Sequence, residues 1–368
     1  MKLLFLALVA AMAVVAGAVH AGEGPEDSRH RRIEERYSKW PTQAITYQLG
    51  KSRILDLRRR AEQLQAGAAA RQRFHLLFMR QGTIPPGYFA EALLADMAQG
   101  GPASDSTVRS ADGVPIRYEV RGSGEPALVF VHCWACDGHF WDAQVDRFAK
   151  THTVVTLDLA GHGESGRGRT AWTIAAFAED VKAVVDKLGL RRVVLIGHSL
   201  GGPVALEAAR RLPGRVVALV PVDTLLNVEQ QEKPEEIAAF LAPFHKDFRS
   251  ASEAFIRQWM FTPRSDPRLI EAVVAAAHRM PPDIAVAILE TAWNYDPRPA
   301  LRGLRIPIIA VNADKFPTRL EINRRYAPQF DALIQKKAGH YLMREDPAAF
   351  NALLEEALAR AGADRPSK

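Results

Sequence analysis

The stretch at residues 193–211, VVLIGHSLGGPVALEAARR, decides the fold. An apolar run leads into Gly197, Ser199 stands two residues later, and an alanine-rich pattern with helical spacing follows at once. A short apolar run is typical of a buried strand, and apolar residues three and four apart are typical of a helix. The sequence therefore predicts a sharp strand-to-helix turn with Ser199 at the bend.

The residues around this serine fit the pattern G-x-S-x-G, which presents a nucleophilic serine at such a turn. Gly197 and Gly201 are needed because a Cβ atom at so tight a bend would strike the neighbouring backbone. The first turn of the following helix supplies free N–H groups and the positive end of its dipole, which favour an anion beside Ser199. We therefore expect the bend to display a nucleophile.

A mainly parallel sheet with helices on both faces is predicted around this turn, which is an α/β fold. Short apolar runs alternate with helical patterns of ten to fifteen residues, and this spacing is typical of parallel strands joined by crossover helices. A hairpin turned at Asp112-Gly113 adds antiparallel strands at one edge. The apolar runs are residues 127–132, 153–159, 192–197, 215–223 and 306–314.

The alternation divides the chain into a core and an insertion. Residues 105–224 form the first part of the core and residues 305–368 the second part. Residues 225–304 hold several amphipathic helical patterns and no clear strand. We expect this insertion to be a helical layer on the core.

The N-terminus has the features of a secretory signal peptide. Residues 1–21 contain one lysine, an apolar run and a small-residue cleavage pattern at Val19-His20-Ala21. The predicted product is periplasmic or secreted, with no stable membrane insertion after cleavage; a membrane anchor formed by an uncleaved N-terminus is the alternative. Residues 22–104 are expected to be helical, with breaks at Pro41 and Gly50 and a linker at 100–106.

Composition excludes several classes of protein. Of the 368 residues 48% are hydrophobic and 24% charged, which is typical of a globular protein, and the net charge is +6. No arginine-lysine stripe interleaved with aromatic residues is present, so no nucleic-acid partner is predicted. Neither a cofactor nor a metal is predicted. Cys133 and Cys136 form a Cys-x-x-Cys pair, and whether they close a disulfide stays open.

Ser199 needs a base, because a serine hydroxyl is a weak nucleophile until its proton is removed. In this architecture the base lies late in the chain, on a loop after the last strand, and His340 in KKAGHYLMREDP is there. The acid that orients the imidazole is expected just after the strand IPIIAVNAD, where Asp314 is the only carboxylate. Asp223, at the end of the strand that follows the serine helix, is the alternative acid.

Two backbone N–H groups must donate hydrogen bonds to the negatively charged oxygen of a tetrahedral intermediate. One is expected to be the N–H of Leu200, directly after the nucleophile. The other is expected from the loop after the apolar run 127–132, with Trp134 preferred and Cys133 second.

The chain resembles the α/β-hydrolase superfamily over residues of about 106–361, through GHSLGG, VH...G..W, LDLAGHGES and AGHYLM.E.P in that order. The resemblance implies that residues 225–304 are a helical cap over the serine. It also implies a serine hydrolase of esterase type that cleaves a carboxylic ester or related acyl substrate through an acyl-enzyme. C–C hydrolase or haloperoxidase chemistry with the same triad is an alternative, and so is a non-catalytic small-molecule-binding protein.

Large apolar side chains in FLAPFHKDF, FIRQWMF and ILETAWNY suggest a small apolar or aromatic acyl substrate. Residues of about 33–94 resemble the C-terminal segment of an uncharacterised bacterial family similar to HExxH metallopeptidases. The HExxH motif itself is absent from the sequence, so this region is expected to be free of metal. Its helices are a candidate surface for a protein partner.

Overall fold

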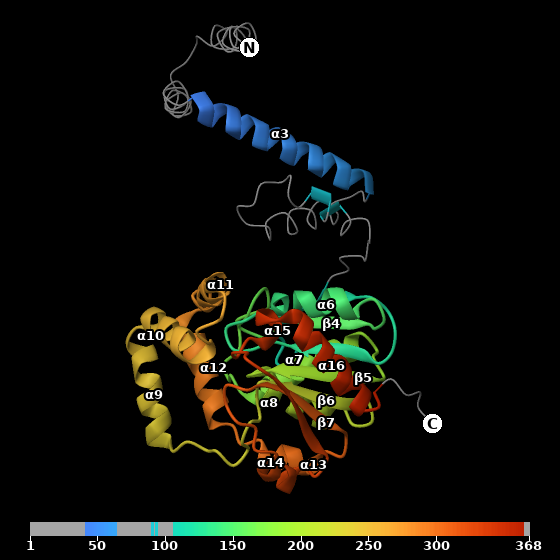
Figure 1. Cartoon of the computed structure of the whole chain (residues 1–368), viewed down its shortest axis with the longest axis vertical. Helices are drawn as coiled ribbons and strands as arrows, with labels where there is room; N and C mark the ends of the chain where they lie inside the picture. The colour runs from blue at the N-terminus through green and yellow to red at the C-terminus, as the bar shows by residue number, and fades with distance from the viewer. Residues whose placement is uncertain (1–40, 65–89, 92, 95–105, 364–368) are drawn as a thin grey trace, which may run out of the picture. The chain divides into compact units, whose positions relative to one another are not determined.

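The computed structural model describes residues 41–64, 90–91, 93–94 and 106–363 (Figure 1). The chain divides into two compact units, Met1–Ala103 and Ser104–Lys368. The predicted signal peptide, most of the linker and much of the N-terminal helical region lie outside the described residues.

The described part of the first unit is mainly one long helix, α3 (Pro41–Leu64). The helix begins at Pro41, where proline lacks only a hydrogen bond that the first turn would not make. The predicted break at Gly50 is wrong, because the helix continues through it. A glycine inside a helix costs about 1 kcal/mol, which the strong helix formers on both sides outweigh. Arg60 Nη2 of this helix lies 2.9 Å from Glu91 Oε1.

The second unit is built on an eight-stranded sheet, and the predicted α/β architecture is confirmed. The first two strands form the predicted hairpin around Gly113, and the second of them also pairs antiparallel with β4. All other neighbouring strands are parallel. In spatial order the strands are β1 (Thr107–Arg109), β2 (Pro115–Arg121), β4 (Val154–Leu157), β3 (Ala127–Val131), β5 (Val193–His198), β6 (Val216–Val222), β7 (Ile308–Ala313) and β8 (Phe330–Gln335).

Two groups of helices flank the sheet (Figure 1). One group packs α7 (Ile174–Lys187) against α8 (Gly201–Arg211), and the other packs α16 (Pro347–Arg360) against α6 (Asp142–Phe148) and α15 (Leu342–Glu345). The short helix η2 (Gly138–Trp141) precedes α6, and α14 (Leu320–Tyr326) precedes β8. Every residue of β3, β4 and β5 is buried, as expected for parallel strands covered on both faces.

The segment between β6 and β7 is helical. In Figure 1 its helices lie beside the sheet, and α12 runs back toward it. No single helix among the described residues has the length and apolar character to cross a membrane; only the pair α11 and α12, bent by 105°, passes that test jointly. The elements are α9 (Pro234–Lys246), α10 (Phe248–Phe255), the π-helix η3 (Ile256–Met260), α11 (Pro267–Ala277), α12 (Pro282–Asn294) and α13 (Arg298–Gly303).

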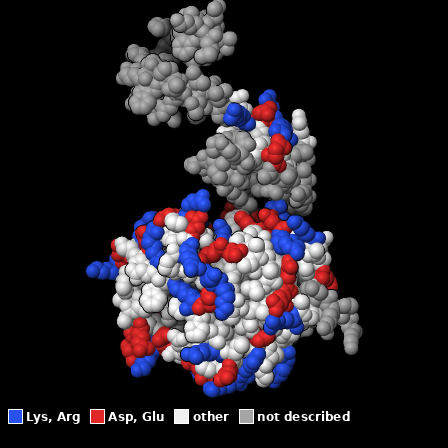
Figure 2. Space-filling view, viewed as in Figure 1, with Lys and Arg blue, Asp and Glu red and all other residues white. Residues whose placement is uncertain are grey.

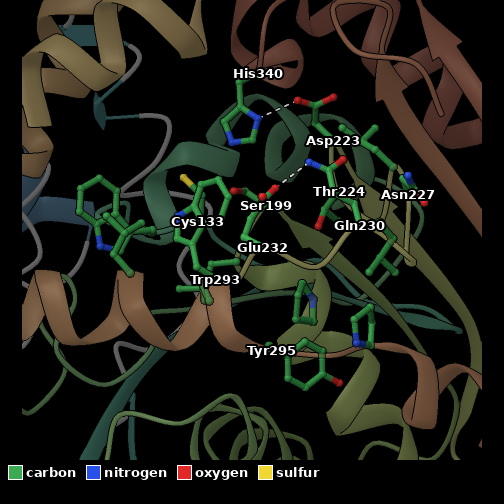
Figure 3. Close-up of a pocket in the computed structure, with 18 of the residues that line it drawn as sticks. Cys133, Ser199, Asp223, Thr224, Asn227, Gln230, Glu232, Trp293, Tyr295 and His340 are labelled. Atoms are coloured by element: carbon green, nitrogen blue, oxygen red, sulfur yellow. Dashed lines mark hydrogen bonds and ion pairs between the residues drawn. The ribbon is translucent and has the colours of Figure 1, made fainter. Parts of the chain in front are cut away.

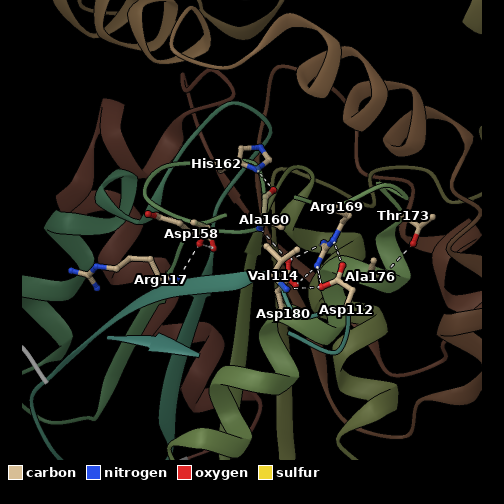
Figure 4. Close-up of polar contacts among 11 residues, drawn as sticks. Asp112, Val114, Arg117, Asp158, Ala160, His162, Arg169, Thr173, Ala176 and Asp180 are labelled. Carbon is tan, nitrogen blue, oxygen red and sulfur yellow. Dashed lines mark hydrogen bonds and ion pairs between the residues drawn. The ribbon is translucent and has the colours of Figure 1, made fainter. Parts of the chain in front are cut away.

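A buried ion-pair cluster fixes the loop that follows β4 (Figure 4). The Arg169 side chain is 2% exposed and lies between Asp112 of the hairpin turn and Asp180 of α7, at 2.6 and 2.5 Å. Asp180 also accepts the backbone N–H of Ala160 at 3.1 Å. The cluster therefore joins the hairpin, helix α7 and this loop, which packs beneath the cap.

Candidate active site

Ser199 lies in a tight turn between β5 and α8, as the sequence predicts. Its φ is +52°, in the left-handed region that a residue with a side chain seldom adopts, and such strain is concentrated at functional sites. A Cβ on Gly197 would lie 2.1 Å from the carbonyl oxygen of Gly201. A Cβ on Gly201 would lie 2.3 Å from the Val131 oxygen. The two glycines are required because the strand and the helix approach too closely for side chains.

Ser199 faces a cavity of about 360 Å³ that His340 and Asp223 also line (Figure 3). Ser199 comes from the bend after β5, Asp223 from the end of β6, and His340 from the loop after β8. The carboxyl ends of parallel strands meet at one edge of a sheet, where ligands of open α/β sheets bind. The topology therefore brings together three residues that are up to 141 positions apart (199 to 340) in the sequence.

The His340 ring is held by a carboxylate. Its Nδ1 lies 2.7 Å from Asp223 Oδ2, and the second oxygen of Asp223 accepts the N–H of Ala313 at 2.9 Å. The side chain of Asp223 is 6% exposed and that of His340 is 15% exposed. Because Nδ1 donates to Asp223, the Nε2 atom of the neutral ring is left as the acceptor.

The preference for Asp314 as the acid is corrected by this geometry. Asp314 is exposed, lies just beyond the end of β7, and accepts the backbone N–H of Lys337 at 2.8 Å. The alternative residue, Asp223, occupies the position against His340. The sequence signal was present, since Asp223 directly follows an apolar strand, but the choice depends on which strand end lies beside the histidine loop.

The candidate oxyanion donors have unused N–H groups. Within the described part of the chain, the backbone N–H groups of Leu200, Trp134 and Cys133 donate no hydrogen bond. Leu200, Trp134 and Cys133 all line the Ser199 cavity. Their placement fits the predicted roles, and the choice between Trp134 and Cys133 as the second donor stays open.

The loop after β3 is cross-linked internally and tied to the cap. Cys133 and Cys136 form a disulfide, which answers the question that the sequence left open. The indole N–H of Trp134 donates to the carbonyl oxygen of Ala285 in α12 at 2.8 Å. The Trp134 ring also meets Phe244, Phe248 and Phe255 edge to face. The disulfide therefore restrains the backbone of this loop, and the Trp134 ring anchors the loop to the cap.

Two contacts that sequence reasoning missed hold the backbone of His340. His198 Nε2 lies 2.8 Å from the His340 carbonyl oxygen, and the His340 N–H donates to the carbonyl of Met260 at 2.7 Å. Complete burial lowers the pKa of His198 well below its usual value, and nearby His340 lowers it further. A neutral ring donating from Nε2 is therefore expected at position 198. The local sequence pattern around His198 could not reveal these contacts, because the loop that carries His340 is remote in sequence.

Among the described residues, no group of three or more His, Cys, Asp or Glu side chains could hold a metal ion. The described residues bring to the cavity a displayed hydroxyl, an imidazole with a buried carboxylate, and free N–H donors.

These features place the chain in a known class. Residues 128–353, more than half of the chain, match the model of the alpha/beta hydrolase family, and the chain belongs to that family. Residues 21–93 match the model of a bacterial protein family of unknown function (DUF885), which agrees with the N-terminal resemblance.

Individual relatives cover the hydrolase part of the chain. A pimeloyl-[acyl-carrier protein] methyl ester esterase of Salmonella newport is 29% identical over 250 residues, which are 64% of this chain and 94% of the esterase. A dihydrolipoyllysine-residue acetyltransferase component of the acetoin cleaving system of Cupriavidus necator is 32% identical over 152 residues. That match spans 38% of this chain and 41% of the acetyltransferase.

A solved thermophilic esterase from Thermogutta terrifontis has the same fold. It superposes with a TM-score of 0.61 at 25% sequence identity, covering 69% of this chain and 98% of the esterase. With the family match, this likeness identifies the protein as an enzyme of the esterase type in the alpha/beta hydrolase family.

Proposed function

We propose that the protein hydrolyses a carboxylic ester or related acyl compound through a Ser199–His340–Asp223 triad. The observation that carries the proposal is the imidazole of His340, which is fixed by a buried carboxylate and lines the same cavity as the displayed Ser199. A nucleophile, a base and a group that orients the base are the parts that acyl transfer requires.

The reaction begins when His340 Nε2 takes the proton of the Ser199 hydroxyl and Oγ attacks the carbonyl carbon. The carbonyl electron pair moves to oxygen, where the Leu200 N–H and one N–H of the loop after β3 stabilise the negative charge. When the tetrahedral intermediate collapses, the bond to the alcohol oxygen breaks and the alcohol leaves with the proton from His340. The acyl group stays on Ser199 as an acyl-enzyme. His340 then takes a proton from water, whose oxygen attacks the acyl carbon; the bond to Ser199 Oγ breaks, the acid leaves, and the proton returns to Oγ. The Asp223 carboxylate stabilises the imidazolium in both halves of the reaction.

In the described chain the Ser199 hydroxyl and the His340 ring are not hydrogen-bonded to each other. Catalytic hydrogen bonds often tighten only when a substrate is in place, so the geometry fits a resting site. The left-handed backbone at Ser199 fixes the side chain on the cavity side of the bend.

The cavity wall favours a neutral acyl group of modest size. Its volume of about 360 Å³ lies at the small end of ligand pockets. An apolar side is supplied by Trp134, Phe255, Leu289 and Trp293. Of the described residues that line the cavity, none is a lysine or an arginine. A carboxylate in the acyl chain would lose its hydration without gaining a counter-ion, which is costly.

The first test is hydrolysis of p-nitrophenyl butyrate by the full-length protein and by Ser199→Ala. We expect the substitution to lower kcat/KM by at least about 10³-fold, because the proposed acyl intermediate forms on the Ser199 oxygen. Turnover by Ser199→Ala at the wild-type rate would overturn the proposal. Retention of small molecules without any turnover by the wild type would instead support a non-catalytic binding protein.

The second test compares two acyl chains of four carbons, butyrate and hemisuccinate, as p-nitrophenyl esters. We expect kcat/KM to be at least about tenfold higher for the neutral ester, which corresponds to about 1.4 kcal/mol. Equal or faster hydrolysis of the hemisuccinate would contradict the proposal of a neutral substrate, but it would not bear on the proposed triad.

We also propose that the protein is exported, on the strength of residues 1–21. The Cys133–Cys136 disulfide supports this, since disulfides persist in oxidising compartments. Cell fractionation and N-terminal sequencing of the mature protein test the proposal, and an intact Met1 in the cytoplasmic fraction would overturn it.

The N-terminal helices are proposed to bind a protein partner or a larger substrate. Deletion of residues 22–100 should therefore leave the turnover of small esters unchanged.

A further inference from the structure

Lys315 lies in the loop after β7 and binds the cap at the point where its π-helix ends. Its Nζ lies 2.5 Å from the carbonyl oxygen of Trp259 and 2.8 Å from that of Phe261. Trp259 belongs to η3, and Phe261 follows its last residue. The final carbonyls of a helix have no partner within the helix, so a cation that donates to them from outside fixes that end.

The carbonyl between these two belongs to Met260, and it accepts the backbone N–H of His340 at 2.7 Å. Three successive carbonyls of the cap are thus used by the two loops that follow β7 and β8. Gly339 permits this approach, because a Cβ there would lie 2.8 Å from the Met260 oxygen and 3.1 Å from the Phe261 Cα. The cap segment 259–261 is therefore in direct contact with the loop that carries His340.

Lys315 is partly buried where it makes these contacts. Burial lowers the pKa of Lys315, and the charges of Glu345 and Asp223 act in the opposite direction. Glu345 itself accepts the N–H of Gly339 and the hydroxyl of the cap residue Ser265 at 2.7 Å. A charged donor to backbone carbonyls forms hydrogen bonds stronger than those between neutral groups, which offsets the desolvation.

We propose that Lys315 is a positioning residue for the base: by fixing the carbonyls of Trp259 and Phe261 it orients the Met260 carbonyl, which holds the backbone of His340. The inference rests on the proposed function of His340. The imidazole of His340 is then aligned only while the segment 259–261 keeps its contacts with Lys315 and with the backbone N–H of His340. Misplacement of a catalytic group by about 1 Å can cost as much as 10²-fold in rate.

The test is to measure kcat and KM of Lys315→Met, a substitution that keeps the length of the side chain and removes its donors. The concentration of active sites is determined by titration with a fluorophosphonate, so that kcat is given per active site. We expect kcat for p-nitrophenyl butyrate to fall about tenfold, with KM within twofold, because the base and not the acyl pocket is disturbed. Lys315→Arg, which can also reach two carbonyls, should recover kcat to within about threefold of the wild type.

Arg257→Met is the matched control. Arg257 lies in the same π-helix, but its guanidinium pairs with Glu253 and Glu271 at the surface. Its removal takes a cation from the same segment without touching the three carbonyls, so kcat should stay within twofold of the wild type. A tenfold loss in this control as well would show a general sensitivity of the cap and overturn the specific role of Lys315.

A value of kcat per active site within twofold of the wild type for Lys315→Met would overturn the inference, whatever its melting temperature. If that variant does not fold, Gly339→Ala carries the test, since its Cβ would lie 2.8 Å from the Met260 oxygen as well as 2.6 Å from Glu345 Oε1, and an unchanged kcat there overturns the inference equally. If the wild type shows Ser199-dependent turnover and the Lys315 variants have the same kcat, only the inference about Lys315 is refuted. A wild type without Ser199-dependent turnover would refute the proposed function as well.

Discussion

Two polar clusters near the cap use the same kinds of residue in opposite ways. In the cluster of Asp112, Arg169 and Asp180, the Arg169 guanidinium bonds both carboxylates, and the Arg169 and Asp180 side chains are almost entirely buried (Figure 4). In the cluster of His340 and Asp223, one side of the imidazole is bonded and the other lies at a cavity (Figure 3). A cluster that satisfies its own members stabilises the fold, whereas one with an unused acceptor can act on a substrate.

The histidines near the site show the same contrast. His162 and His198 are fully buried, and burial lowers the pKa of each well below the ordinary value, with a neighbouring histidine adding to the effect. His340 alone of the three lines the Ser199 cavity and faces a carboxylate. The difference indicates that burial keeps the first two neutral and structural, while the ring of His340 is placed beside the Ser199 hydroxyl's cavity, where a base is needed.

The largest expected effect separates the two carboxylates that were candidates for the acid. Asp223→Asn should lower kcat by about 10³–10⁴-fold, because the amide no longer stabilises the imidazolium or fixes its tautomer. Asp314→Asn is the matched control and should stay within twofold of the wild type. Steady-state kinetics with p-nitrophenyl butyrate decide the matter, and a larger loss in Asp314→Asn would reverse the assignment.

The next effect is on stability alone. Arg169→Met leaves Asp112 and Asp180 without their partner, and breaking a buried ion pair costs about 3–5 kcal/mol. Urea denaturation should show this loss in the free energy of unfolding, while kcat per titrated active site stays within twofold. A variant of unchanged stability with a strongly reduced kcat would mean that the cluster belongs to the catalytic machinery.

Reduction of the Cys133–Cys136 disulfide by a dithiol should have an intermediate effect. The cross-link closes a very short loop, for which the chain-entropy estimate is about 2 kcal/mol. It also restrains the N–H groups of Cys133 and Trp134, so kcat should fall about tenfold while KM changes little. Cys133→Ala/Cys136→Ala should behave like the reduced protein and be insensitive to dithiol. Full activity of this variant would exclude a role for the cross-link in the oxyanion site.

The smallest effect is a pH dependence of stability. The lowered pKa of His162 and His198 means that the unfolded chain binds more protons than the folded one near pH 6.5, so stability is lost as the pH falls. Each histidine should contribute a loss of about 0.7 kcal/mol between pH 7 and pH 6. Denaturant unfolding at both pH values measures it, and His162→Asn should reduce the loss by one histidine's share. An unchanged pH dependence in that variant would contradict the buried neutral state of His162.

Much of the site could be predicted because its signals are local. The bend at Ser199 requires glycines within a few residues of it, and each buried strand is marked by its own apolar run. His340 was found from its place after the last strand. These features depend on backbone sterics and burial, which short stretches of sequence carry by themselves.

The remaining features depend on contacts between distant segments. The choice of Asp223 over Asp314 is set by which strand end faces the His340 loop, and the Met260 and His198 contacts join residues at least 80 positions apart (260 to 340). The helix through Gly50 shows the opposite error, in which a local breaker was overruled by its flanking residues. Neither the long-range contacts nor the helix through Gly50 can be predicted from a single short stretch of sequence.

The most direct measurement is the mapping of a fluorophosphonate adduct by mass spectrometry of the digested full-length protein. We expect one adduct per chain, on Ser199, which disappears in Ser199→Ala and forms far more slowly in His340→Asn. An adduct on another residue, or ester turnover by a protein whose Ser199 stays unmodified, would contradict the claim that this bend displays the nucleophile.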